Sequence, residues 1–291
     1  MLLDNGTEKL KSLLTEIPFG SEFYPTEWKT LDDAPKCLYA LGNIELLRKR
    51  KFAIVGSRRT PMNALKLGEN IAQTLSQKLV IATGTADGGD TAAIEGALKN
   101  GNLLCLLAGG FSALPQGNLP LLERVAKRGL LLSPHPFDTP IRSFSYEYRN
   151  KLLALLCDGV LVLGAGEKSG ALITAKYAEE YKKPLFAFPY PPNSSSGAGC
   201  NRLIKRGGFL VENAEDVAER LQITLTAEKA LPPMSADEEK VYQALKEFGE
   251  THASLLAQKT GIPVFKLRAV LSSLEVKGLT VALGGNTYST I

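Results

Sequence analysis

Short runs of apolar residues recur between residues 52 and 188, and they constrain the fold more than any other feature of this chain. The runs are residues 52–55, 79–82, 103–107, 130–132, 159–163 and 184–188. Between most of them, apolar side chains repeat every four residues, as in Leu67, Ile71 and Leu75, which is the spacing of one helix face. Strands that are apolar on both faces and alternate with such helices form a parallel sheet covered on both sides. We therefore predict an α/β fold, with a Rossmann-like, doubly wound, mostly parallel sheet over residues 36–224.

The pattern changes near Pro232-Pro233, a pair that cannot continue a helix and stiffens the chain. We predict an N-terminal extension over residues 1–35, a linker over 225–235 and a small second domain over 236–291. In that domain the apolar spacing indicates three helices, 238–248, 253–259 and 264–277, the first with Val241, Leu245 and Phe248 on its inner face. Two strands, 279–283 and 287–291, flank a turn signal at 284–286. Three helices followed by a two-stranded wing are typical of a winged helix-turn-helix domain.

The composition excludes several classes of protein. Of the 291 residues, 44% are hydrophobic and 22% are charged, which is ordinary for a globular protein with a core. No apolar run approaches the roughly 18 residues of a membrane span, and the N-terminus has no secretory pattern, so we expect a cytoplasmic protein without membrane contact. The four cysteines form no C-x-x-C pair, and we expect Cys105 and Cys157 to be buried free thiols. Only two histidines are present, so we expect no metal site, and we expect no cofactor.

Several loops of small residues follow the predicted strands, at the edge where open α/β sheets bind ligands. Gly56-Ser57-Arg58 follows the first run, and residues 83–90, with three glycines, follow the second. Ser169-Gly170 precedes a predicted helix, with Ser169 as its N-cap, and residues 193–199 form another polar loop. Small residues let backbone N–H groups approach a phosphate, and a helix N-terminus favours an anion. Taken singly, each loop is equally explained by a tight turn or a helix cap.

A cluster of basic and aromatic residues precedes the fifth of the predicted strands. It comprises Arg142, Tyr146, Tyr148, Arg149, Asn150 and Lys151. Basic side chains bind phosphates, and aromatic rings stack on unpaired bases. The alternative is a solvated helix start whose tyrosines lie at the edge of the core.

These motifs, in this order, resemble the DNA-processing protein A family, also called DprA or Smf. The matching segments are residues 55–58, 83–90, 146–151, 169–175 and 199–207, with further similarity at Tyr24-Pro25 and between Pro35 and Gly42. The resemblance covers about residues 20–224, and many members of the family also end in a winged-helix domain.

The resemblance implies a protein that is not an enzyme. It implies binding of single-stranded DNA without sequence preference, protection of incoming DNA, homodimerisation and loading of the RecA recombinase during natural transformation and recombination. By this analogy Gly56, Ser57 and Arg58 hold a phosphate, and Arg142 or Lys151 supplies a second cation. Tyr146 would contact a base. The full set of implied DNA-binding residues is Gly56, Ser57, Arg58, Gly84, Arg142, Tyr146, Arg149, Asn150, Lys151, Ser169, Gly170 and Asn201.

Four positions depart from the family pattern. Asp87 stands where the family usually has Arg, which would weaken DNA binding if the side chain points into the site. Gly89 replaces an Ile, which we expect to loosen local packing. Tyr190 replaces a Gly after Pro189, and Lys151 replaces an Arg.

Two other functions remain open from the sequence. Related folds cleave nucleoside monophosphates, but with a P-G-G-x-G-T-x-x-E loop that this chain lacks, and the dinucleotide motif G-x-G-x-x-G is also missing. A winged-helix regulator with a ligand-sensing domain is the third possibility. Residues 232–291 carry six basic and six acidic side chains, a net charge of 6 − 6 = 0, so we expect this domain to contact protein rather than duplex DNA.

Overall fold

The computed structural model describes residues 7–225 and 232–290, so most of the predicted linker over 225–235, and Ile291, lie outside the described residues. The chain divides into two compact units, Met1–Leu225 and Thr226–Ile291, and each is described by itself. The first unit contains a nine-stranded sheet with the order β1-β2-β6-β5-β4-β3-β7-β8-β9. The second contains a three-stranded sheet.

Six strands of the large sheet coincide with the six apolar runs. They are β3 (Lys51–Val55), β4 (Val80–Thr83), β5 (Leu103–Leu106), β6 (Leu130–Ser133), β7 (Val160–Val162) and β8 (Leu185–Ala187). These strands and the short β9 (Phe209–Leu210) pair in parallel. The prediction of a mostly parallel, Rossmann-like sheet is therefore confirmed.

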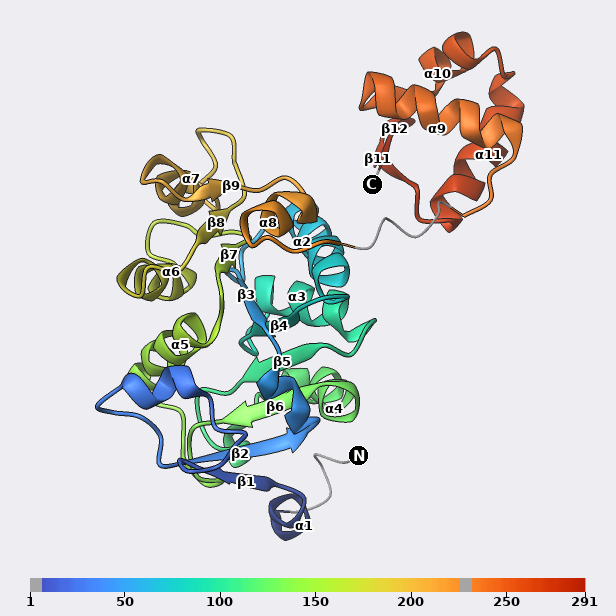
Figure 1. Cartoon of the computed structure of the whole chain (residues 1–291). Helices are drawn as coiled ribbons and strands as arrows, with labels where there is room; N and C mark the ends of the chain where they lie inside the picture. Colours follow the sequence, from blue (N-terminus) through green and yellow to red (C-terminus); the bar gives the residue numbers. More distant parts are fainter. Residues whose placement is uncertain (1–6, 226–231, 291) are drawn as a thin grey trace. The chain divides into compact units, whose positions relative to one another are not determined.

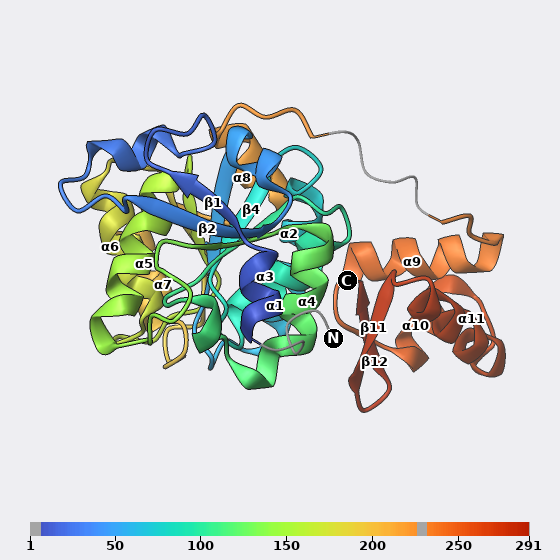
Figure 2. The same ribbon diagram turned by 90° about the horizontal axis from the view of Figure 1, so that it is seen from below.

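The sheet is covered by helices on both faces (Figures 1 and 2). On one face lie α2 (Met62–Leu75), α3 (Gly89–Leu98), α4 (Leu119–Arg128) and α8 (Ala214–Arg220). On the other lie α5 (Ser143–Leu156), α6 (Ala171–Glu180) and α7 (Ala198–Lys205). Alternate residues of β3 enter the two cores: Phe52 and Ile54 pack on the first face, and Ala53 and Val55 on the second. This is why each strand is apolar throughout.

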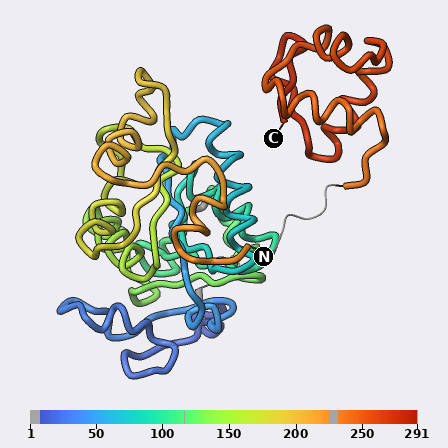
Figure 3. Tube along the Cα trace, turned by 45° about the horizontal axis from the view of Figure 1, so that its top comes forward, coloured from blue at the N-terminus to red at the C-terminus, as the bar shows by residue number. Residues whose placement is uncertain are grey.

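Residues before β3 add an antiparallel edge that the periodicity of the sequence did not indicate. After α1 (Thr7–Ser12), β1 (Thr15–Pro18) pairs with β2 (Cys37–Gly42), and β2 pairs with β6. Between β1 and β2, in the short helix η1 (Thr26–Thr30), the side chain of Trp28 is fully buried, and its Nε1 donates to the carbonyl of Leu152 in α5 at 2.9 Å. Figure 3 shows this segment in blue along one edge of the unit. Residues 15–35 thus share the core of the sheet. The remaining short helices are η2 (Ile44–Arg48), η3 (Phe111–Ala113) and η4 (Gln116–Asn118).

The second unit has the winged-helix architecture predicted from the sequence. Its elements are α9 (Ala236–Phe248), β10 (Thr251–His252), α10 (Ala253–Thr260), α11 (Val264–Val276), β11 (Thr280–Gly284) and β12 (Thr287–Thr290). Val241 and Leu245 enter its core, whereas Phe248 is 42% exposed because it lies at the last turn of α9. The prediction that Phe248 faces inward is wrong.

The structure also bears on membrane spans, metal ligands and the cysteines. Within residues 7–225 and 232–290, no helix is long and apolar enough to cross a membrane, and no three His, Cys, Asp or Glu side chains gather as metal ligands. Cys105 and Cys157 are buried free thiols, as predicted, and Cys200 is buried as well. Burial raises the pKa of all three thiols, which leaves them protonated and unreactive near neutral pH.

Candidate nucleic-acid interface

A cavity of about 960 Å³ opens beyond the carboxyl ends of β3 and β7, lined by the loops that follow β3, β4, β7 and β8 and by α5. The chain runs outward from β3 to β6 and then returns to β7 on the other side of β3. The loops after β3 and β7 therefore diverge to opposite faces of the sheet and leave a crevice between them, which is where open α/β sheets bind ligands. Eight of the predicted DNA-binding residues line this cavity: Gly56, Ser57, Arg58, Tyr146, Arg149, Asn150, Ser169 and Gly170.

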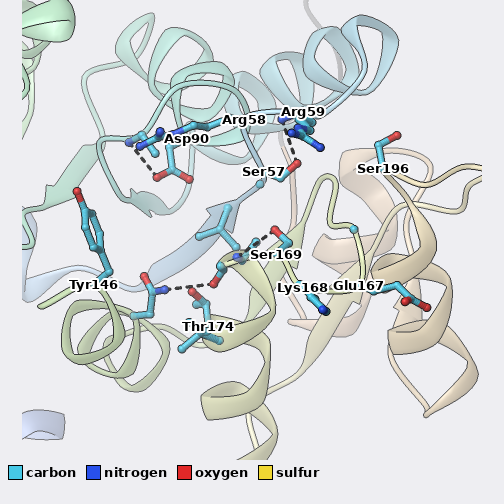
Figure 4. A pocket seen from close by; sticks show the side chains of 18 of the residues that line it. Ser57, Arg58, Arg59, Asp90, Tyr146, Glu167, Lys168, Ser169, Thr174 and Ser196 are labelled. Atoms are coloured by element: carbon cyan, nitrogen blue, oxygen red, sulfur yellow. Dashed lines mark hydrogen bonds between the residues drawn. The ribbon is translucent and has the colours of Figure 1, made fainter. Parts of the chain in front are cut away.

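The loop after β3 is held against the start of α3 by direct backbone contact. A Cβ atom built on Gly89 would lie 2.3 Å from the Cα of Gly56, so neither glycine tolerates a side chain. Ser57 Oγ accepts the N–H of Arg59 at 3.2 Å. This packing places Arg58 and Arg59 as exposed side chains at the rim of the cavity (Figure 4). The expectation that Gly89 loosens the packing is wrong, because its lack of a side chain is what permits the contact.

The loop after β7 presents a helix N-terminus to the same cavity. The helix α6 begins at Ala171 with Gly170 in the capping position, one residue later than predicted, and Ser169 Oγ still accepts the N–H of Ala171 at 3.3 Å. Asn150 Nδ2 donates to the carbonyl of Gly170 at 3.3 Å, which ties α5 to this loop. The positive end of the α6 dipole thus lies at the cavity, and Lys168, on the same loop, is an exposed residue of the cavity wall.

A buried ion pair forms the floor of the cavity. The side chains of Arg149 and Asp90 are 8% and 6% exposed, and Arg149 Nη1 lies 4.0 Å from Asp90 Oδ2. Burial raises the pKa of the Asp90 carboxyl, and the guanidinium of Arg149 opposes that shift. Among the described residues, Arg149 Nε is a buried donor without a hydrogen-bond acceptor.

The remaining charges at the cavity are predominantly positive. Glu167 forms an ion pair with Arg202 at 2.7 Å. In the part of the chain that the structure describes, Arg58, Arg59 and Lys168 form no ion pair. The cavity thus combines three unpaired cations with two carboxylates that are each paired to an arginine. One aromatic ring, that of Tyr146, projects from α5 at a further side of the cavity and is 43% exposed (Figure 4).

Four predicted residues do not line the cavity: Gly84, Arg142, Lys151 and Asn201. Gly84 lies beneath it, where a Cβ atom would come within 1.7 Å of Arg149 Nη1. Arg142 is the exposed N-cap residue of α5. Lys151 Nζ binds the carboxylate of Asp33 at 2.7 Å, so it does not supply a cation to the cavity.

Asn201 and Asp87 have different surroundings from those expected. Asn201 holds the backbone of Tyr190, because its Oδ1 accepts the Tyr190 N–H at 2.9 Å and its Nδ2 donates to the Tyr190 carbonyl at 2.8 Å. Asp87 is exposed and does not line the cavity, so the reversal of charge at this position lies outside the site. Conversely, Arg59 and Lys168 line the cavity but were not predicted. Arg59 follows the predicted Arg58 and Lys168 precedes the predicted Ser169, so their positions in the sequence could have indicated them.

The comparisons with known proteins agree with this architecture. Residues 15–222 match the model of the family described as DNA recombination-mediator protein A, and residues 226–286 match the DprA winged helix domain. The chain belongs to the DprA family. Protein Smf of Escherichia coli is 31% identical over 92% of this chain and 75% of its own length. The DNA processing protein DprA of Bacillus subtilis is 35% identical over 72% and 71%, respectively.

Two solved structures of DprA proteins superpose on the chain. The protein from Streptococcus pneumoniae gives a TM-score of 0.68 at 32% identity, covering 75% of this chain and 78% of that chain. The protein from Helicobacter pylori, whose structure concerns its single-stranded DNA binding mode, gives 0.65 at 30% identity over 72% and 95%.

Proposed function

We propose that this DprA-family protein binds single-stranded DNA in the cavity beyond β3 and β7, and that it does so through the DNA backbone and without sequence preference. The observation that carries the proposal is the convergence of three unpaired cations and the N-terminus of α6 on one cavity. Such a site favours phosphate, because the guanidinium of Arg58 offers paired N–H donors and the helix adds a positive dipole.

The position of Tyr146 favours an unpaired strand over a duplex. Its ring is partly exposed beside the cations, so a base next to a bound phosphate can stack on it. Stacking on an aromatic ring is worth about 1–3 kcal/mol per base and tolerates every base, because each has a π-face. Bases of a duplex are already stacked and cannot reach the ring without unpairing.

The paired state of the two carboxylates supports binding rather than catalysis. Asp90 is buried against Arg149, and Glu167 is held by Arg202. A carboxyl group acts as a general acid or base only when it can reach the proton that it transfers, and pairing with an arginine hinders this. We therefore propose a non-enzymatic mediator in preference to a nucleoside-monophosphate hydrolase.

Titration of fluorescent oligothymidine, with a matched duplex as competitor, tests the proposed site. At low salt we expect Arg58→Ala to weaken single-strand binding about tenfold, because a charge-assisted, bidentate contact is lost. The logarithm of affinity should fall with the logarithm of salt concentration, with a slope reduced by about 0.7 for each phosphate contact removed. Arg142→Ala is the control, since this exposed cation of α5 does not line the cavity. Equal losses from the two variants would place the binding site elsewhere.

We further propose that the protein acts as a homodimer, protects incoming strands and loads the RecA recombinase onto them. The family description as a recombination mediator supports this role. DNA-dependent ATP hydrolysis by RecA on a strand coated with single-strand binding protein should rise when this chain is added. Light scattering should give twice the mass of the chain. A monomer that leaves RecA activity unchanged would contradict the mediator proposal.

A further inference from the structure

Tyr190 lies shortly after β8, where the family pattern has a glycine, and its side chain joins the end of β7 to the start of α7. Its hydroxyl donates to the carbonyl of Leu163, the residue that follows β7. Its ring packs against Gly197, the residue before α7, and its backbone is held by Asn201. The side chain does not line the cavity, so the DNA contacts proposed above do not account for it.

The ring of Tyr190, and not the backbone, is what requires a glycine at position 197. Gly197 has a φ of −114° and a ψ of −4°, a conformation that is open to residues with side chains. A Cβ atom built on it would lie 1.9 Å from Tyr190 Cγ, far inside van der Waals contact. The tyrosine ring therefore fills the space that a side chain at position 197 would take, and the two residues are complementary.

This contact closes a loop, residues 191–197, that forms one wall of the cavity. Ser195 and Ser196 both line the cavity. Within the loop, the Gly197 N–H donates to the Ser194 carbonyl at 3.2 Å. Over residues 7–225 and 232–290, the backbone N–H groups of Ser195 and Ser196 have no hydrogen-bond acceptor. The loop therefore holds two successive backbone donors that are available to a ligand in the cavity.

We propose that Tyr190 is a positioning residue of the DNA site: by holding the loop, it places Ser195 and Ser196 as uncharged donors to a phosphate of the bound strand. This inference rests on the proposed function. Backbone N–H groups of successive residues bind anions in many phosphate sites, and here they share the cavity with its three unpaired cations. Because the serines carry no charge, their contribution to affinity does not depend on salt concentration, unlike that of the cations.

Salt-dependent titrations of oligothymidine separate the positioning of the loop from a loss of charge. We expect Tyr190→Gly to weaken binding about fivefold, which corresponds to a lost uncharged hydrogen bond, without changing the slope of log affinity against log salt. Arg58→Ala, in contrast, should lose slope as well as affinity. Tyr190→Phe keeps the ring against Gly197 and should bind within about twofold of the unmodified chain.

A double-mutant cycle tests whether the ring acts through the loop. Gly197→Ala should also weaken binding about fivefold, because the added Cβ atom pushes the ring and the loop apart. Combined with Tyr190→Gly, it should cause no further loss, since no ring remains to be displaced. Additive losses would show that the two residues act separately and would overturn the proposal.

Melting temperatures of the same variants separate a loss of stability from a loss of the site. Tyr39→Ala removes a partly buried ring from β2, away from the cavity, and should lower the melting temperature without changing affinity. Unchanged affinity in Tyr190→Gly, or a reduced salt slope, would overturn the positioning role while Arg58→Ala still identifies the site. If Arg58→Ala also binds as the unmodified chain does, it is the proposed function that fails.

Discussion

Gly84 illustrates how a single residue maintains the floor of the site from below. A Cβ atom there would overlap Arg149 Nη1 at 1.7 Å and approach Asp90 Oδ2 to 2.3 Å. Neither side chain can withdraw easily, because both are buried in one ion pair. We expect Gly84→Ala to lower the free energy of unfolding by about 2 kcal/mol through overpacking and disruption of this pair.

Urea denaturation followed by the fluorescence of Trp28, the chain's single tryptophan, measures this change in the sheet unit. Gly170→Ala provides the comparison, because an added Cβ atom at that position of the cavity wall meets nothing within 4 Å. A midpoint for Gly84→Ala equal to that of Gly170→Ala would show that the Arg149–Asp90 pair has more freedom than its packing indicates.

At the level of elements, one carboxylate joins the start of α9 to the end of α11. Glu238 accepts the N–H of Ser235 at 2.6 Å, the hydroxyl of Ser273 at 2.6 Å and the ammonium of Lys277 at 2.7 Å. The hydrogen bond from Lys277, followed by those from Ser273 and Ser235, lowers the pKa of Glu238 from 4.5 to about 2. A carboxyl whose pKa is lower in the folded state stabilises the fold above pH 4.5, and this contribution is lost as the pH falls towards 2.

We therefore expect the winged-helix unit to open more readily between pH 4.5 and 2, and Glu238→Gln to remove most of that dependence while weakening the unit at neutral pH. Amide hydrogen exchange in α9 and α11 of the full chain, corrected for the intrinsic pH dependence, reports this opening. Glu239→Gln, at the exposed neighbouring position, should behave like the unmodified chain. An unchanged pH profile in Glu238→Gln would mean that another group controls the acid sensitivity.

At the scale of the whole molecule, the main cavity is built entirely from the sheet unit. The winged-helix unit is neutral over residues 232–291, and on α11 it exposes Phe265 at 82% and Val276 at 90%. Exposed apolar side chains on a unit without net charge favour contact with protein over contact with duplex DNA. We expect a chain ending at residue 225 to bind single strands within about threefold of the full chain.

Anisotropy titrations of the shortened and full chains with the same oligothymidine check this independence. A loss of more than about tenfold would assign part of the DNA site to the winged-helix unit. Duplex DNA provides the second readout, since a loss confined to duplex binding would identify α11 as a groove-reading helix rather than a protein contact.

Local patterns in the sequence determined a large part of this structure. Strand length, apolar faces and helix spacing are properties of neighbouring residues, so the six central strands, their helices and the wing were predictable. The edge of the sheet that carries the site was predictable too, because glycine and small residues follow the strands that end there. The short strands β1, β2 and β9 were missed, since runs of two to six residues with mixed burial have little periodicity.

Only the tertiary structure decided which charges serve the cavity. Lys151 and Asp33 lie 118 residues apart in sequence, and Arg149 on α5 meets Asp90 on α3. No local pattern therefore indicates that Lys151 is neutralised or that Arg149 is buried. Whether a side chain lines a site depends on the path of the whole chain, because its partners arrive from distant segments. The sequence by itself therefore located the edge of the sheet where ligands bind, and the packing of distant segments selected Arg58, Arg59 and Lys168 as its unpaired cations.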